Sequence, residues 1–132
     1  MKNLFKTTTP VTIFLIAVFC ASCEKDNYDQ EVKYYVKGLT ENYEVSYINE
    51  NGETITEQVA PISVNDSWSY TFMGEPGDIV YLYTQYYDVA VNEKNFTVRI
   101  LIEDKIFKDA YGYDKEEGDT VFYILRSGTI PY

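Results

Sequence analysis

The acidic segment around residue 115 holds the densest group of side chains that could bind a metal ion. Asp114, Glu116, Glu117 and Asp119 lie close together, and Lys115 interrupts them. Calcium takes six to eight oxygen ligands, so these four carboxylates would need backbone oxygens and water to complete a site. The spacing differs from that of an EF-hand loop, and acidic surface loops are usually just solvated. We therefore expect no metal or cofactor, with a calcium site in this segment as the alternative.

Catalysis by side chains is poorly supported. The chain has no His, the usual general base near neutral pH. Ser67 and Ser127 have no base nearby in the sequence, and no Gly-x-Ser-x-Gly motif occurs. Two carboxylates can hydrolyse a glycosidic bond, but in a chain with 21 acidic residues such pairs arise easily by chance. We expect a protein that is not an enzyme.

The fourteen tyrosines are better candidates for a functional surface. Tyrosine combines a large apolar body with a polar tip. The alternation of apolar and polar residues places Tyr35, Tyr81, Tyr83 and Tyr87 on strand faces that point away from the core. Exposed rings on a flat sheet can stack on sugars or receive a partner protein. The alternative is that these rings pack on neighbouring strands.

Cys23 is the residue whose surroundings most clearly predict a modification. It follows a basic start, an apolar run over residues 11–19 and the small pair Ala21-Ser22. This order is typical of a bacterial lipoprotein signal, in which residues 1–22 are removed and Cys23 receives the lipid. The apolar run is too short for a spanning helix, which needs about 20 residues. The acidic residues that follow Cys23 resemble the surface-export signal of Bacteroidetes lipoproteins, so we expect an outer-membrane lipoprotein displayed at the surface.

The charge of the processed chain limits its partners. Removal of residues 1–22 takes away Lys2 and Lys6, which leaves nine basic against 21 acidic residues and a net charge of −12. This acidity disfavours nucleic acid, because no basic stripe would neutralise phosphates. It also disfavours adsorption to anionic headgroups, so the lipid is the expected membrane contact. No disulfide is expected, because Cys20 leaves with the signal and Cys23 is lipidated.

The remaining residues predict a short polar tether over 23–30 and one all-β domain over 31–132. Strand-like runs cover residues 31–38, 43–49, 53–60, 67–73, 79–87, 96–103, 105–110 and 120–126. Turn residues separate them, including Asn51-Gly52 and the pair Glu103-Asp104. The run at 105–110 is expected to bury Ile106, and the tail from residue 127 to be irregular. Seven or eight short strands favour an antiparallel, Ig-like β-sandwich, with a closed barrel as the alternative.

The order of these motifs resembles the MmpS family of small exported β-sandwich domains. The similar stretches are residues 36–38, residues 45–52, Trp68 ahead of the turn at 76–78, and the hairpin over 98–106. Mycobacterial members carry a membrane helix where this chain has the lipoprotein motif. The resemblance implies the fold and a non-enzymatic, partner-binding role.

These observations lead to one function hypothesis and two alternatives. The first is a cell-envelope lipoprotein whose β-sandwich docks on another envelope protein. The second is a carbohydrate-binding module that uses the tyrosine face. The third is a fimbrial subunit that assembles by strand donation, because a sheet edge can accept a partner strand.

Overall fold

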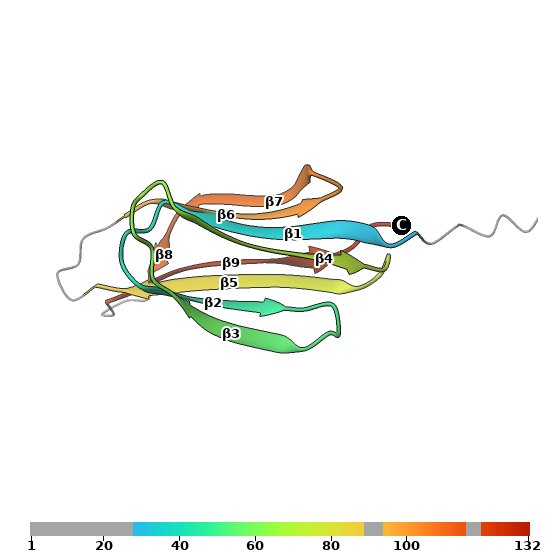
Figure 1. The fold of residues 1–132 in the computed structure, drawn as a ribbon, viewed down its shortest axis with the longest axis horizontal. Helices are drawn as coiled ribbons and strands as arrows, with labels where there is room; N and C mark the ends of the chain where they lie inside the picture. The colour runs from blue at the N-terminus through green and yellow to red at the C-terminus, as the bar shows by residue number, and fades with distance from the viewer. Residues whose placement is uncertain (1–27, 89–93, 116–119) are drawn as a thin grey trace, which may run out of the picture.

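The computed structural model describes residues 28–88, 94–115 and 120–132, which form two antiparallel sheets packed face to face (Figure 1). The four-stranded sheet has the order β4-β1-β6-β7, and the five-stranded sheet has the order β3-β2-β5-β9-β8. The strands are β1 (Gln30–Lys37), β2 (Tyr43–Ile48), β3 (Thr54–Val59), β4 (Ser67–Gly74), β5 (Ile79–Tyr87), β6 (Phe96–Ile102), β7 (Lys105–Gly112), β8 (Asp114–Lys115) and β9 (Val121–Thr129). The predicted antiparallel β-sandwich is confirmed. The described residues form eight long strands and the two-residue β8, and they include no cysteine.

Alternation along the strands builds the core. Val32, Tyr34 and Val36 of β1 are fully buried, while Lys33 and Tyr35 between them reach the outer side. The same alternation holds in β2, β5 and β6. Each strand thus contributes one apolar face to the space between the sheets, as two packed sheets require.

Aromatic rings fill one side of this core, where β4 of the first sheet faces β2 and β3 of the second. The Tyr47 ring lies 5.2 Å from the Trp68 ring and 4.6 Å from the Tyr70 ring. The polar tips of the two β4 rings face acidic side chains. Trp68 donates to Glu57 at 3.1 Å, and Tyr70 donates to Glu50. Each ring is therefore partly buried against the core while its polar tip has a hydrogen-bond partner.

The β6–β7 hairpin confirms one expectation and corrects another. Glu103 and Asp104 form the tight turn with φ values of 51° and 59°. Ile106 was expected in the core, but its side chain is 57% exposed. The tight turn pairs Ile102 with Lys105, so Ile106 lies opposite the outward Leu101; a register shift between Ile100 and Leu101 then adds one residue to β7 and returns Ala110 to the core. A bulge of this kind reverses the faces of the strand that carries the extra residue.

The last strand is longer than expected. The tail was expected to be irregular from Ser127, but Ser127, Gly128 and Thr129 pair with Tyr81, Val80 and Ile79 of β5. The chain keeps its backbone hydrogen bonds there because a neighbouring strand is present, which no local pattern reveals. Phe122 and Ile124 of β9 are buried, so the intervening Tyr123 and the following Leu125 lie on the outer side of the five-stranded sheet.

Candidate functional site

Three of the four candidate tyrosines share one face. Tyr81, Tyr83 and Tyr87 alternate with the buried Leu82, Thr84 and Tyr86 along β5, so they lie on the outer side of the five-stranded sheet. Tyr81 and Tyr83 are partly exposed, and Tyr87 is 62% exposed. The expectation that these three rings point away from the core is confirmed.

Strand β9 adds two further apolar side chains to this surface. Leu125 lies opposite Tyr83, and Tyr123 lies opposite Gln85. The Tyr83 and Tyr123 rings are 5.8 Å apart at an angle of 34°, and Leu125 is 42% exposed. We call Tyr81, Tyr83, Tyr87, Tyr123 and Leu125 the tyrosine face.

A chain of hydrogen bonds crosses three strands beside these rings. Gln58 of β3 and Gln85 of β5 each donate to Glu44 of β2, with both distances 2.8 Å. Tyr83 in turn donates to the side-chain oxygen of Gln85 at 2.9 Å. The chain fixes four side chains in one arrangement, so a ligand would meet a surface that is already ordered.

A shallow hollow of about 280 Å³ lies at the end of this hydrogen-bonded chain. The polar groups that line it come from Asn42, Glu44, Gln58 and Gln85, and the exposed Tyr87 ring forms one wall. Tyr43 and Tyr86 also line it, but both side chains belong to the core. Burial raises the pKa of Tyr43 to about 12 and also raises the pKa of Tyr86.

Sequence reasoning missed Glu44, Gln58, Gln85 and Tyr123 as parts of this surface. The pairing of Glu44 with Gln58 could have been predicted from the hairpin. β2 and β3 are antiparallel strands joined by residues 49–53, and this pairing places Glu44 opposite Gln58. Gln85 joins them only through the pairing of β2 with β5, which connects strands far apart in the sequence.

Tyr35, the fourth candidate, is not brought together with the others. It lies on the outer side of β1 in the four-stranded sheet, opposite Arg99 of β6 and Ser69 of β4. The two outer faces lie on opposite sides of the sandwich, so Tyr35 cannot contact a ligand held by Tyr81 or Tyr83. It belongs to a different surface.

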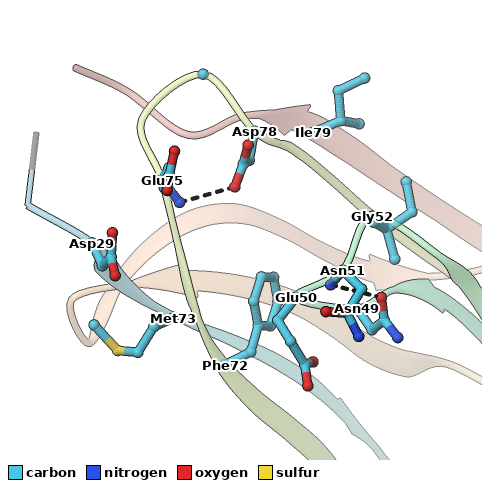
Figure 2. Close-up of a pocket in the computed structure, with 12 residues that line it drawn as sticks. Asp29, Asn49, Glu50, Asn51, Gly52, Phe72, Met73, Glu75, Asp78 and Ile79 are labelled. Carbon is cyan, nitrogen blue, oxygen red and sulfur yellow. Dashed lines mark hydrogen bonds between the residues drawn. The ribbon is translucent and has the colours of Figure 1, made fainter.

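Another hollow, of about 590 Å³, lies at the end of the sandwich where β1 begins (Figure 2). The β2–β3 loop and the β4–β5 turn form its sides. Asp29, Glu50, Glu75 and Asp78 line it together with Phe72 and Met73. The Asp78 side chain accepts from the Glu75 backbone N–H at 2.9 Å, and Glu50 accepts from Tyr70, so two of the carboxylates already serve the fold.

The remaining site expectations fall largely outside the described residues. Cys23, Glu116, Glu117 and Asp119 lie there, while Asp114 is exposed in β8. Among residues 28–88, 94–115 and 120–132, no three or more His, Cys, Asp or Glu side chains form a group that could hold a metal ion. No helix in these same ranges is long and apolar enough to cross a membrane.

No protein-family model matches this chain, and no curated protein matches it. The resemblance to the MmpS family stays a prediction.

Proposed function

We propose that this chain is a non-enzymatic cell-envelope lipoprotein, anchored in the outer membrane through lipid on Cys23, whose β-sandwich docks on another envelope protein. The tyrosine face is the docking surface in this proposal. The observation that carries it is the row of partly exposed apolar side chains from Tyr81 through Tyr83 to Leu125 and Tyr123 across two adjacent strands.

The composition of the face is suited to a protein partner. Clustered exposed apolar side chains on a soluble domain mark interaction surfaces. Tyrosine is enriched at the energetic centres of protein interfaces, where its ring loses little conformational entropy on burial. Gln58, Glu44 and Gln85 beside the rings would form the polar rim of such an interface.

Co-purification from the envelope fraction tests this function. The doubly substituted Tyr83→Ala, Leu125→Ala chain is expected to lose a partner that the unmodified chain retains. Tyr111→Ala is the matched control, because Tyr111 is 74% exposed but lies on β7 of the other sheet. Equal recovery of the partner by all three chains would count against docking through the tyrosine face.

A carbohydrate-binding module is the second candidate, and the 280 Å³ hollow is the observation that favours it. Side-chain amides, a carboxylate and a tyrosine ring meet there, and these groups can hydrogen-bond to sugar hydroxyls and stack on a sugar ring. Retardation in gels that contain neutral polysaccharides, lost in a Tyr87→Ala chain, would favour sugar, because Tyr87 is the exposed ring that lines the hollow. Recovery of one envelope protein without any such retardation would favour docking.

Strand donation is the third candidate. β3 and β4 are the edge strands on one side of the two sheets, and neither carries the lysine or proline that commonly protects an edge. A fimbrial subunit would give high-mass ladders on unheated gels. A clean monomer would exclude this candidate.

A further inference from the structure

Tyr35 sits at the centre of a cationic surface on the four-stranded sheet. Lys33 and Lys37 lie two residues before and after it on the same face of β1. Arg99 lies opposite Tyr35 on β6, and Ser69 lies opposite it on β4. We call these five residues the Tyr35 face.

This face is positively charged, although the chain as a whole is strongly acidic. The processed chain has nine basic residues and a net charge of −12, yet three of the nine surround one tyrosine. Within the described part of the chain, Lys33 and Lys37 make no ion pair, and Arg99 pairs through Nε with Asp109 at 2.8 Å. The Arg99 terminal nitrogens keep donors available, because a guanidinium carries five N–H groups.

The shape and polarity of the face point to a sugar rather than to a bare anion. A hollow of about 150 Å³ is lined by Lys33, Tyr35, Arg99 and Leu101, so one aromatic ring and one apolar side chain lie between the two cations. Along its side, β4 presents the exposed hydroxyls of Ser67, Ser69 and Thr71. An aromatic platform with hydroxyl neighbours suits a pyranose ring, and the cations suit carboxylates attached to it.

We propose that the Tyr35 face binds an acidic polysaccharide, in which uronate sugars alternate with neutral ones. Tyr35 stacks on a sugar ring, Lys33, Lys37 and Arg99 meet its carboxylates, and the β4 hydroxyls bond to its hydroxyls. A membrane surface fits less well, because the end of the sandwich nearest the tether is acidic: Asp29, Glu50, Glu75 and Asp78 all line its hollow. A nucleic acid fits less well, because its denser phosphates would extend past three cations onto carboxylates.

Affinity electrophoresis with hyaluronate tests the proposal, with dextran as the neutral polymer and single-stranded DNA as the competing anion. We expect retardation by hyaluronate that weakens as salt is added, and little retardation by dextran through this face. Lys33→Gln with Lys37→Gln should weaken binding about tenfold, because each exposed charge contact contributes modestly. Tyr35→Ala should weaken it to a similar degree, and Tyr35→Phe should not, since the ring and not the hydroxyl is used.

A charge-matched control separates this site from a general loss of positive charge. Lys105→Gln with Lys115→Gln removes the same charge from exposed positions away from the Tyr35 face, and binding should be unchanged. The Tyr83→Ala, Leu125→Ala chain should also bind hyaluronate normally, so this site and the tyrosine face can fail independently. The melting temperatures of the variants are compared first, so that only folded chains are scored. The proposal would be overturned if both lysine pairs lost hyaluronate binding equally. It would also be overturned if dextran retarded the chain as much as hyaluronate does, or if DNA retarded it more.

Discussion

The Tyr34 hydroxyl donates a hydrogen bond to the backbone carbonyl of Ile48 at 2.9 Å, which links the four-stranded sheet to the five-stranded sheet through the core. The same hydroxyl accepts from the Tyr81 backbone N–H at 3.3 Å. The β2–β5 pairing ends at Tyr47 and Leu82, so Ile48 and Tyr81 would form the next pair. The Tyr34 hydroxyl therefore bonds to the Ile48 carbonyl and the Tyr81 N–H, just beyond the last β2–β5 pair. It thereby fixes the backbone at Tyr81, the first residue of the tyrosine face.

Loss of this hydroxyl should destabilise the protein without changing its fold. In Tyr34→Phe, a partly buried carbonyl and a partly buried N–H lose their partner, which costs about 1–3 kcal/mol of unfolding free energy. Urea denaturation should show a lower midpoint with an unchanged slope. Tyr35→Phe is the control on the adjacent, outward position and should leave the midpoint unchanged. Matching midpoints for the Tyr34 variant and the unmodified chain would show that the hydroxyl does not stabilise the sandwich.

Removing a different buried hydroxyl should stabilise the protein. Thr84 in β5 is fully buried, and within residues 28–88, 94–115 and 120–132 its hydroxyl oxygen has no hydrogen-bond partner. Thr84→Val replaces it with a methyl group of similar size, so the free energy of unfolding should rise by about 1 kcal/mol. Thr97→Val, on the outer side of β6, is the control and should change stability by less than about 0.5 kcal/mol. A lower stability of Thr84→Val would show that the hydroxyl does stabilise the folded protein.

The protein should lose stability in strong alkali through its buried tyrosines. Burial raises the pKa of both Tyr34 and Tyr43 from 10.0 to about 12. Between pH 10 and 12 the unfolded chain releases these protons while the folded chain keeps them, so unfolding becomes more favourable as the pH rises. Thermal melts across this range should show a melting temperature that falls as the pH rises. Tyrosinate absorbance of the folded protein should show one group of tyrosines that ionises at higher pH than the rest. Ionisation of all tyrosines in one step near pH 10, in the folded protein, would refute this account.

Gly128 should be replaceable only together with a neighbour. A Cβ at this position would lie 2.6 Å from Cε1 of Phe107 and 3.1 Å from Cε of Lys108. Gly128→Ala should therefore cost about 1–3 kcal/mol of stability, as overpacking does. Adding Phe107→Leu should recover part of that loss, which a double-mutant cycle in urea measures. Additive effects of the two substitutions would mean that the contact between β7 and β9 is not tight.

Features that depend on neighbouring residues could be predicted from the sequence, whereas features that depend on a partner strand could not. Alternation within a strand predicted the bounds of β1, β2 and β6 to within one residue, because it depends on residues two positions apart. The hairpin at Asn51-Gly52 was predicted, although its loop spans residues 49–53 and only Gly52 there has a positive φ, of 75°. Ile106 and the buried Ala110 lie on opposite faces of β7 because a bulge separates them, and bulges depend on the partner strand.

The same reasoning explains the division of the candidate site. The outward direction of Tyr35 and of Tyr83 is a local property, and it was predicted correctly. Their separation onto opposite faces depends on β1 pairing with β4 and β6, while β5 pairs with β2 and β9. Strand order is decided by contacts between segments that are distant in the sequence. The sequence alone therefore did not predict that Tyr35 lies on one surface and the other three tyrosines on another.

Site-specific photo-cross-linking in intact cells tests most directly whether the tyrosine face is the docking surface. A photoreactive phenylalanine derivative would replace Tyr83 in one chain and Tyr111, on β7, in another. The proposal predicts one discrete cross-linked product of constant mass from position 83 and none from position 111. A product from position 111 alone, or the same products from both positions, would contradict it.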